Sequence, residues 1–99
     1  MDKIKELTEV YKALSDPTRL RLVKLLNDQD GALCVNALAR ELGVSQSAVS
    51  QHLRILRQVG LVTGERRGSS VHYTLSQDGL EQYKSRILDT LGENFIISL

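Results

Sequence analysis

Apolar residues recur every three or four positions in several stretches of the chain, a spacing that places them on one face of an α-helix. In the first stretch, from Lys3 to Leu14, these residues are Ile4, Leu7, Tyr11 and Leu14. We therefore expect this segment to form a helix that packs against another helix.

A second helix is expected to follow directly. Asp16 can accept hydrogen bonds from the free N–H groups of a helix start, and Pro17 fits the first helical position because no N–H is needed there. The helix should run from Pro17 to about Leu26. Its buried residues should be Leu20, Val23 and Leu26 or their neighbours.

A tight turn at Gly43–Ser45 separates two further helical patterns, residues 35–42 and residues 46–59. Ser45 is placed to cap the second of these helices. Two short helices joined by a turn containing glycine form a helix-turn-helix, whose second helix enters the major groove of DNA.

This second helix carries an apolar face and a polar face that has no acidic residue. The polar face consists of Ser47, Ser50, Gln51, Arg54, Arg57 and Gln58. A face exposed only for solubility usually mixes acidic with basic residues, whereas hydroxyl, amide and guanidinium groups match base edges and phosphates. The composition of this face therefore favours contact with DNA.

The spacing of apolar residues then changes to every second position, which indicates β-strands. Residues 61–67 and 71–75 flank a turn at Gly68–Ser70, so we expect a hairpin. A hairpin directly after a recognition helix is the wing of a winged helix. Its inner face should carry Val71, Tyr73 and Leu75.

The last helix is expected to open at Ser76–Asp78, with Gly92 as its C-cap. Its apolar stripe comprises Leu80, Tyr83, Ile87, Leu88 and Leu91. An apolar tail follows, with Phe95, Ile96, Ile97 and Leu99. Such a tail needs a partner surface.

These elements predict a mainly α-helical fold with a small β-hairpin, a single winged helix-turn-helix domain over residues 1–99. Hydrophobic residues make up 41% of the chain, and no apolar run approaches the roughly 20 residues that cross a bilayer. We therefore expect no membrane association. The start lacks the continuous apolar segment of a secretion signal, and the single cysteine, Cys34, agrees with a reducing environment. Both observations favour the cytoplasm.

The net charge of +1 neither supports nor excludes nucleic acid, so the positions of the charges matter. Side chains near the start of a recognition helix reach base edges, where glutamine can form two hydrogen bonds with adenine and arginine with guanine. Our candidates for these contacts are Gln46, Ser47, Ser50, Gln51 and Arg54. Arg66 and Arg67, at the tip of the hairpin, suit phosphates or a narrow minor groove. The alternatives are a solvated helix face and a charged tip that keeps an edge strand soluble.

Four other polar residues have less specific expectations. His52 lies on the apolar face of the recognition helix, where we expect a packed histidine with a satisfied hydrogen bond. His72 lies on the strand face opposite Tyr73 and could meet solvent or a DNA phosphate. Arg19 and Arg21 could pair with acids of the first helix or contact phosphates.

Three segments resemble the ArsR/SmtB family of bacterial winged-helix transcriptional repressors: KALSDPTRLRLVKLL (12–26), LARELGVSQSAVSQHLRILRQVGLV (38–62) and RRGSSVHYTL (66–75). The resemblance covers nearly the whole chain. It implies a homodimer, built from the first and last helices, that represses by occupying an inverted-repeat operator in double-stranded DNA and is released by an inducer. The apolar stripes of those two helices agree, because two chains could cover what one small core cannot.

The inducer sites of the family are only partly present. Members that bind metals through thiolates carry Cys-Val-Cys, whereas this chain has Cys34-Val35-Asn36 and no second cysteine. Members that sense zinc or nickel carry Asp and His ligands on the last helix, which has no histidine here. We therefore expect no metal site and no cofactor.

Cys34 has two interpretations. The first is structural, because a small buried cysteine needs no function, and we favour this interpretation. The second is that the thiol, which lies near a helix start, senses a reactive signal. Constitutive repression, an organic effector and oxidation across the dimer all stay open.

The leading hypothesis is a sequence-specific DNA-binding repressor. The alternative is a winged-helix protein-interaction module whose apolar tail docks on a partner. We do not expect an enzyme, because the chain has no glycine-rich phosphate loop and no recognisable nucleophile and histidine pair.

Overall fold

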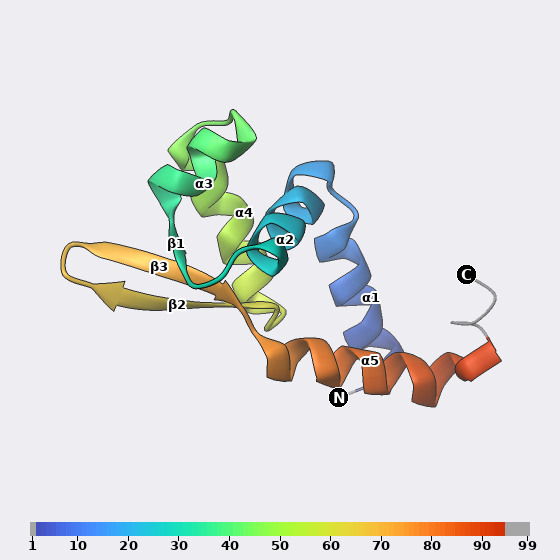
Figure 1. Cartoon of the computed structure of the whole chain (residues 1–99). Helices are drawn as coiled ribbons and strands as arrows, with labels where there is room; N and C mark the ends of the chain where they lie inside the picture. Colours follow the sequence, from blue (N-terminus) through green and yellow to red (C-terminus); the bar gives the residue numbers. More distant parts are fainter. Residues whose placement is uncertain (1, 95–99) are drawn as a thin grey trace.

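The computed structural model describes residues 2–94 of the chain. Within this range, the chain forms five helices and a small three-stranded antiparallel sheet, whose hairpin extends away from the helices (Figure 1). The elements are α1 (Lys3–Leu14), α2 (Pro17–Asp28), β1 (Leu33–Cys34), α3 (Val35–Leu42), α4 (Gln46–Gln58), β2 (Val62–Arg67), β3 (Ser70–Leu75) and α5 (Gln77–Leu91). The predicted fold class is confirmed. The apolar tail, residues 95–99, lies outside the described residues.

Short polar side chains begin the helices as the sequence predicted. The Asp16 carboxylate accepts from the Arg19 N–H at 3.0 Å, and the Ser45 hydroxyl oxygen accepts from the Ala48 N–H at 3.1 Å. Gly43 ends α3 with φ at 66°, a left-handed conformation that glycine adopts without strain. Gly43 and the Ser45 cap together set the turn between α3 and α4.

The core lies where α2, α3 and α4 meet the base of the sheet. Its most deeply buried side chains are Leu22, Leu38, Val49, Leu53, Leu56 and Leu61. The expected burial of Leu20 is wrong, because this side chain is 54% exposed. Leu22 and Leu26 are spaced four residues apart and take the inner face of α2 instead.

The buried stripe of α1 also differs from the predicted one. Leu7, Val10 and Ala13 pack inward, while Ile4 and Tyr11 are 57% and 46% exposed. Both sets satisfy a spacing of three or four residues, so the periodicity alone could not choose between them. The exposed pair leaves an apolar edge on this helix.

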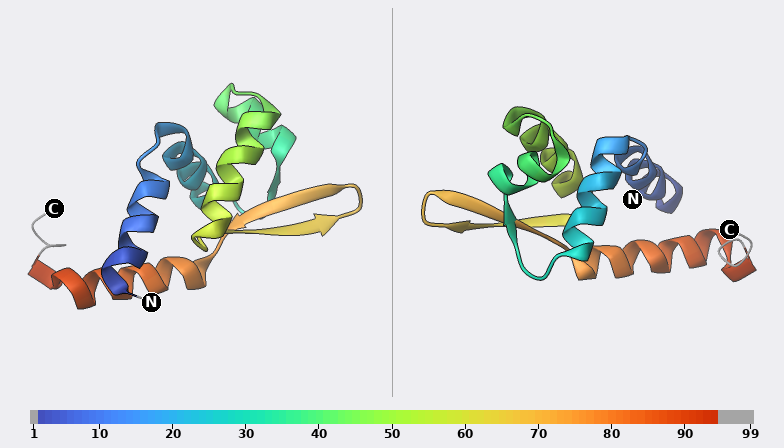
Figure 2. Two further views of the ribbon diagram at one scale, coloured as in Figure 1. Left: turned by 180° about the vertical axis from the view of Figure 1, so that it is seen from behind. Right: turned by 45° about the horizontal axis from the view of Figure 1, so that its top comes forward.

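The sheet has the order β1-β3-β2, with the short strand β1 at one edge. β2 pairs with β3 from Val62 opposite Leu75 to Arg67 opposite Ser70. This hairpin projects from the helical body as a wing, whereas α5 leaves the body in the other direction (Figures 1 and 2).

The first turns of α5 pack tightly on the end of α4. A Cβ atom added at Gly79 would lie 2.0 Å from the Gly60 carbonyl oxygen, so only glycine fits there. The Tyr83 hydroxyl donates a hydrogen bond to the Val59 carbonyl. α5 thereby holds the C-terminal end of α4 in place. None of the helices within residues 2–94 has the length and apolar character needed to span a membrane.

Candidate nucleic-acid interface

The five candidate base contacts share one exposed face of α4. Gln46, Ser47, Ser50, Gln51 and Arg54 are all exposed, while Val49, Leu53 and Leu56 on the opposite face are buried. Leucine and valine side chains therefore anchor the helix and leave the polar face open to solvent. Figure 2 shows the wing extending outward from near the C-terminal end of this helix.

Two hollows lie between α4 and the wing. One, of about 470 Å³, is lined by Ser50, Arg54, Arg57, Gln58 and Tyr73. The other, of about 340 Å³, is lined by Cys34, Val35, Asn36, Gln46, Ser50, Ser69, Ser70, Val71 and Tyr73. Ser50 and Tyr73 belong to both, so the polar face of α4 and the inner face of the wing form one continuous surface. The sequence pattern indicated Tyr73 only as an inward residue of the hairpin.

The two arginines of the wing are exposed near its tip. Arg67 Nη2 lies 3.5 Å from Glu65 Oε2, but both side chains are more than half exposed, so water screens this ion pair. Arg66 forms no ion pair with any of the described residues. Both guanidinium groups are therefore accessible to an anionic partner.

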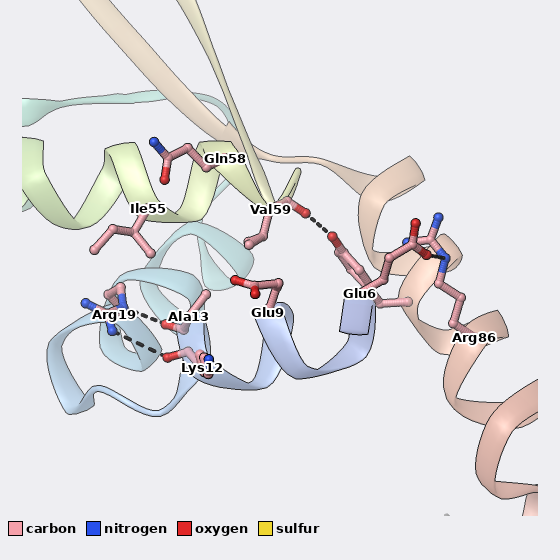
Figure 3. A pocket seen from close by; sticks show the side chains of 10 residues that line it. Glu6, Glu9, Lys12, Ala13, Arg19, Ile55, Gln58, Val59 and Arg86 are labelled. Atoms are coloured by element: carbon pink, nitrogen blue, oxygen red, sulfur yellow. Dashed lines mark hydrogen bonds and ion pairs between the residues drawn. The ribbon is translucent and has the colours of Figure 1, made fainter. Parts of the chain in front are cut away.

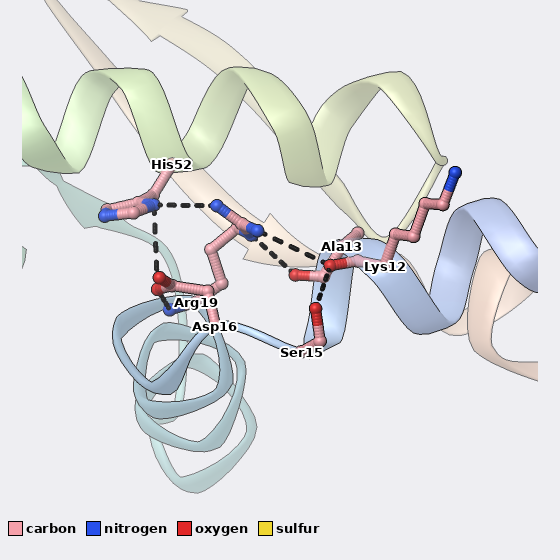
Figure 4. A network of polar contacts seen from close by, with 6 residues as sticks. All are labelled: Lys12, Ala13, Ser15, Asp16, Arg19 and His52. Atoms are coloured by element: carbon pink, nitrogen blue, oxygen red, sulfur yellow. Dashed lines mark hydrogen bonds and ion pairs between the residues drawn. The ribbon is translucent and has the colours of Figure 1, made fainter.

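A polar network attaches α4 to the junction of α1 and α2 (Figure 4). Arg19 donates to the carbonyl oxygens of Ala13 at 2.6 Å and Lys12 at 3.4 Å, and its Nη1 lies 3.3 Å from His52 Nδ1. Because a guanidinium group can only donate, His52 Nδ1 accepts in this contact. The packed, hydrogen-bonded histidine is confirmed, and Arg19 has a structural role that neither of its predicted alternatives included.

Asp16 joins the same network. Its carboxylate caps α2 and lies 3.9 Å from His52 Nδ1. The hydrogen bond from the Arg19 backbone N–H holds the pKa of Asp16 below its usual value, and the charge of the Arg19 guanidinium acts in the same direction. The ionised carboxylate is thus the form that the fold stabilises.

The expected exposure of His72 to solvent or phosphate is wrong for its Nδ1 atom, which is buried and has no hydrogen-bond partner among the described residues. His72 lies opposite Cys34 on one side and Glu65 on the other, because β3 is the central strand. Cys34 is half-buried and forms no disulfide with any described residue. No three Cys, His, Asp or Glu side chains within residues 2–94 are grouped so that they could hold a metal ion.

A further hollow, of about 350 Å³, lies between α1, α4 and α5 (Figure 3). Across it, Arg86 on α5 pairs with Glu6 on α1 at 3.1 Å, and the Arg86 guanidinium lies 5.4 Å from the centre of the Tyr83 ring. The sequence indicated Tyr83 as part of an apolar stripe, but it had no signal for these polar contacts. Here too, α5 is connected to both α1 and α4.

The chain matches the family described as "Bacterial regulatory protein, arsR family" over residues 16–63, from the cap of α2 to the start of the wing. It is 40% identical over 94 residues to a transcriptional repressor SmtB homolog from Synechocystis, covering 95% of this chain and 70% of that protein. It is also 40% identical over 81 residues to the arsenical resistance operon repressor of Escherichia coli, with 82% and 68% covered.

Solved structures agree with this relationship. An ArsR-like transcriptional regulator from Rhodococcus superposes with a TM-score of 0.76 at 29% identity, covering 96% of this chain and 87% of that one. A homodimeric winged helix-turn-helix DNA-binding domain from Mycobacterium bovis superposes with a TM-score of 0.71 at 25% identity, with 91% and 82% covered. The relatives are regulators and not enzymes, as expected. The chain therefore belongs to the ArsR family of bacterial regulatory proteins and is a DNA-binding transcriptional regulator with a winged helix-turn-helix fold.

Proposed function

We propose that the protein is a homodimeric repressor that occupies an inverted-repeat operator in the cytoplasm and is released by an inducer. The observation that carries this proposal is the exposed, acid-free face of α4 beside a wing with two accessible arginines. Amides, hydroxyls and guanidinium groups on a helix that fits the major groove are the groups that recognise base edges.

Within this proposal the two surfaces have different tasks. Gln46, Ser47, Ser50, Gln51 and Arg54 contact base edges and determine sequence preference. Arg66 and Arg67 contact the backbone or the minor groove and mainly determine affinity, because phosphate contacts carry no sequence information.

The apolar residues that one chain leaves exposed support the dimer. Ile4 and Tyr11 on α1 and Leu91 on α5 are each close to half exposed or more, and α1 packs on α5. The Mycobacterium bovis relative is homodimeric. Pairing through these helices would give a two-fold axis, with the two α4 helices in successive major grooves about 34 Å apart.

Selection from random duplex DNA with the purified full chain, followed by a salt titration on the enriched sequence, tests this proposal. We expect an inverted repeat whose half-sites lie about one helical turn apart and an affinity that falls steeply with salt. Weak binding without sequence enrichment would contradict the repressor function and would favour the protein-interaction module.

The inducer is not identified by the described side chains. Cys34 borders the hollow that also contains Gln46 and Ser50, but a single half-buried thiol is accounted for by packing alone. We keep this structural interpretation. If a thiol-directed reagent released the wild type from its operator and left Cys34→Ser bound, Cys34 would instead be a sensing residue.

A further inference from the structure

The hollow between the C-terminal half of α4 and strand β3 is basic. Arg54 and Arg57 line it, and no acidic residue does. The hollow between α1, α4 and α5 contains Glu6 and Glu9 beside its basic groups; the groove along α2 has two basic residues in a mainly apolar lining, and one of them, Lys24, pairs with Asp28. The α4–β3 hollow combines two guanidinium groups with hydroxyl and amide groups, a lining that suits an anion.

Its polar groups are available for a ligand. Among the described residues, the guanidinium groups of Arg54 and Arg57 and the hydroxyl of Tyr73 form no hydrogen bond or ion pair. Ser50 and Gln58 add a hydroxyl and an amide at the border of the hollow. A phosphate group accepts hydrogen bonds from donors of these types.

The sheet holds Tyr73 in a defined position. Tyr73 pairs with Gly64 across the hairpin, and a Cβ atom added at Gly64 would lie 3.0 Å from Tyr73 Cε1 and 3.1 Å from Val71 Cγ1. The tyrosine ring therefore packs over a residue that has no side chain. This packing explains why a glycine interrupts β2, and it fixes the ring beside α4.

The position of the hollow along α4 favours a DNA phosphate rather than a base as its ligand. Arg57 is eleven residues after Gln46, which corresponds to about 16 Å along a helix, whereas the major groove is about 12 Å wide. When the start of α4 contacts base edges, its last turn lies over the sugar-phosphate backbone. Arg57 also stabilises the helix dipole from this position, but that role alone would not affect DNA binding.

We propose that Arg57 and Tyr73 form a subsite for one phosphate of the DNA backbone at the junction of the recognition helix and the wing, next to Arg54, which contacts a base edge in the proposed function. This inference rests on the proposed function, because it assumes that α4 enters the major groove. The inference adds Arg57 and Tyr73 to the proposed DNA contacts. Both residues position α4 on the DNA backbone and do not determine the sequence preference.

The test compares Arg57→Gln and Tyr73→Phe with the wild type on the selected operator across a range of salt concentrations. Arg57→Gln should lower the salt slope by about 0.9 and the affinity about eightfold at about 0.1 M salt, because one phosphate contact is lost. Tyr73→Phe should weaken binding with an unchanged slope, because no charge is removed. Neither variant should change the sequence preference, whereas Gln51→Ala should relax it.

Lys84→Gln is the control for the lost charge. Lys84 is an exposed basic residue of α5, outside α4 and the wing. This variant also removes one positive charge and should leave the salt slope unchanged. Equal effects of Arg57→Gln and Lys84→Gln, or an altered sequence preference in Arg57→Gln, would overturn the proposal. Thermal unfolding of Tyr73→Phe verifies that its weaker binding does not reflect unfolded protein.

Operators with a single uncharged methylphosphonate identify the phosphate directly. At one position in each half-site, the substitution should weaken the wild type more than it weakens Arg57→Gln, because the variant has already lost the charged contact to this phosphate. If every position weakens both proteins equally, the subsite does not exist. Failure of the wild type to select any operator would instead contradict the proposed function itself.

If the wild type selects no operator, the hollow can still be tested without DNA. Inorganic phosphate is titrated into the protein, and binding is followed by NMR through the Arg57 Nε–H resonance. Saturation by inorganic phosphate in a protein that selects no operator would assign the hollow to a free anion and would also overturn the DNA subsite.

Discussion

Individual charged residues on this protein differ in what they contribute, according to their partners. Arg19 is held by two carbonyl oxygens and by His52, so it connects α2 to α1 and α4. Arg66 and Arg67 have no comparable partners within the described residues. Charge alone therefore does not identify a DNA contact, and the absence of internal partners is the better indicator.

Replacing both Arg66 and Arg67 by glutamine should reduce the salt slope of DNA binding by up to about 2, because two phosphate contacts would be lost. Fluorescence anisotropy over a range of salt concentrations measures this slope. The sequence preference should stay unchanged, and Lys84→Gln again serves as the control. An unaltered slope would show that the wing does not touch the backbone.

Asp16 should make stability depend on pH. Its pKa is lowered in the folded protein, chiefly by the hydrogen bond from the Arg19 N–H. The stabilisation is therefore present above the unfolded pKa of about 3.9 and is lost as the pH falls through the folded value. In urea unfolding between about pH 6 and pH 2, the wild type should lose stability more steeply than Asp16→Asn. Parallel pH profiles of the two proteins would contradict the lowered pKa.

At the scale of the elements, α5 and its N-cap pack on the segment that directly follows α4. Ser76 N–H donates to the Leu61 carbonyl at 2.9 Å, Gly79 packs on Gly60, and the Tyr83 hydroxyl donates to the Val59 carbonyl. These contacts connect a helix of the proposed dimer interface to the recognition helix. A change in the position of α5 would therefore alter the presentation of α4 to DNA.

Gly79→Ala tests this packing. Alanine in place of glycine normally stabilises a helix by about 0.5–1 kcal/mol, but here the new Cβ atom would meet a backbone oxygen at 2.0 Å. We expect a net loss of about 1–3 kcal/mol in the free energy of unfolding, measured with urea. Ser85→Ala, at an exposed site of the same helix, should change it by less than about 0.5 kcal/mol. A stabilised Gly79→Ala protein would show that α5 does not rest on Gly60.

At the scale of the whole molecule, the exposed apolar residues lie on two different surfaces. Ile4, Tyr11 and Leu91 belong to α1 and α5, whereas Leu20 borders a groove along α2. Ile4, Tyr11 and Leu91 lie on the two helices that we assign to the dimer interface. Leu20 lies outside these helices and is about as exposed as Ile4, so it serves as a control position.

Ile4→Glu combined with Leu91→Glu should convert the dimer to monomers, because two buried carboxylates per chain would have no partner in the interface. Sedimentation velocity measures the change, and operator affinity should fall because a monomer contacts one half-site. Leu20→Glu, at a residue 54% exposed compared with 57% for Ile4, should stay dimeric. Dissociation by Leu20→Glu but not by the double variant would place the interface on α2.

Several features of this protein follow from neighbouring residues along the chain. Asp16 and Ser45 cap helices through hydrogen bonds that reach only three residues ahead, and Gly43 ends α3 by its own conformational freedom. The polar face of α4 and the strands of the wing follow from helical and alternating periods. Such local interactions are readable from the sequence because no distant segment takes part in them.

The tertiary structure decided what depends on segments distant in sequence. Leu22 rather than Leu20 is buried because α3, α4 and the sheet cover only one of two similar stripes on α2. The Nδ1 atom of His72 is buried in β3, which pairs with the two-residue strand β1, and Tyr73 lines the same hollow as Arg57 because β3 lies next to α4. The sequence thus determined which residues can face DNA, and long-range packing decided how they are brought together.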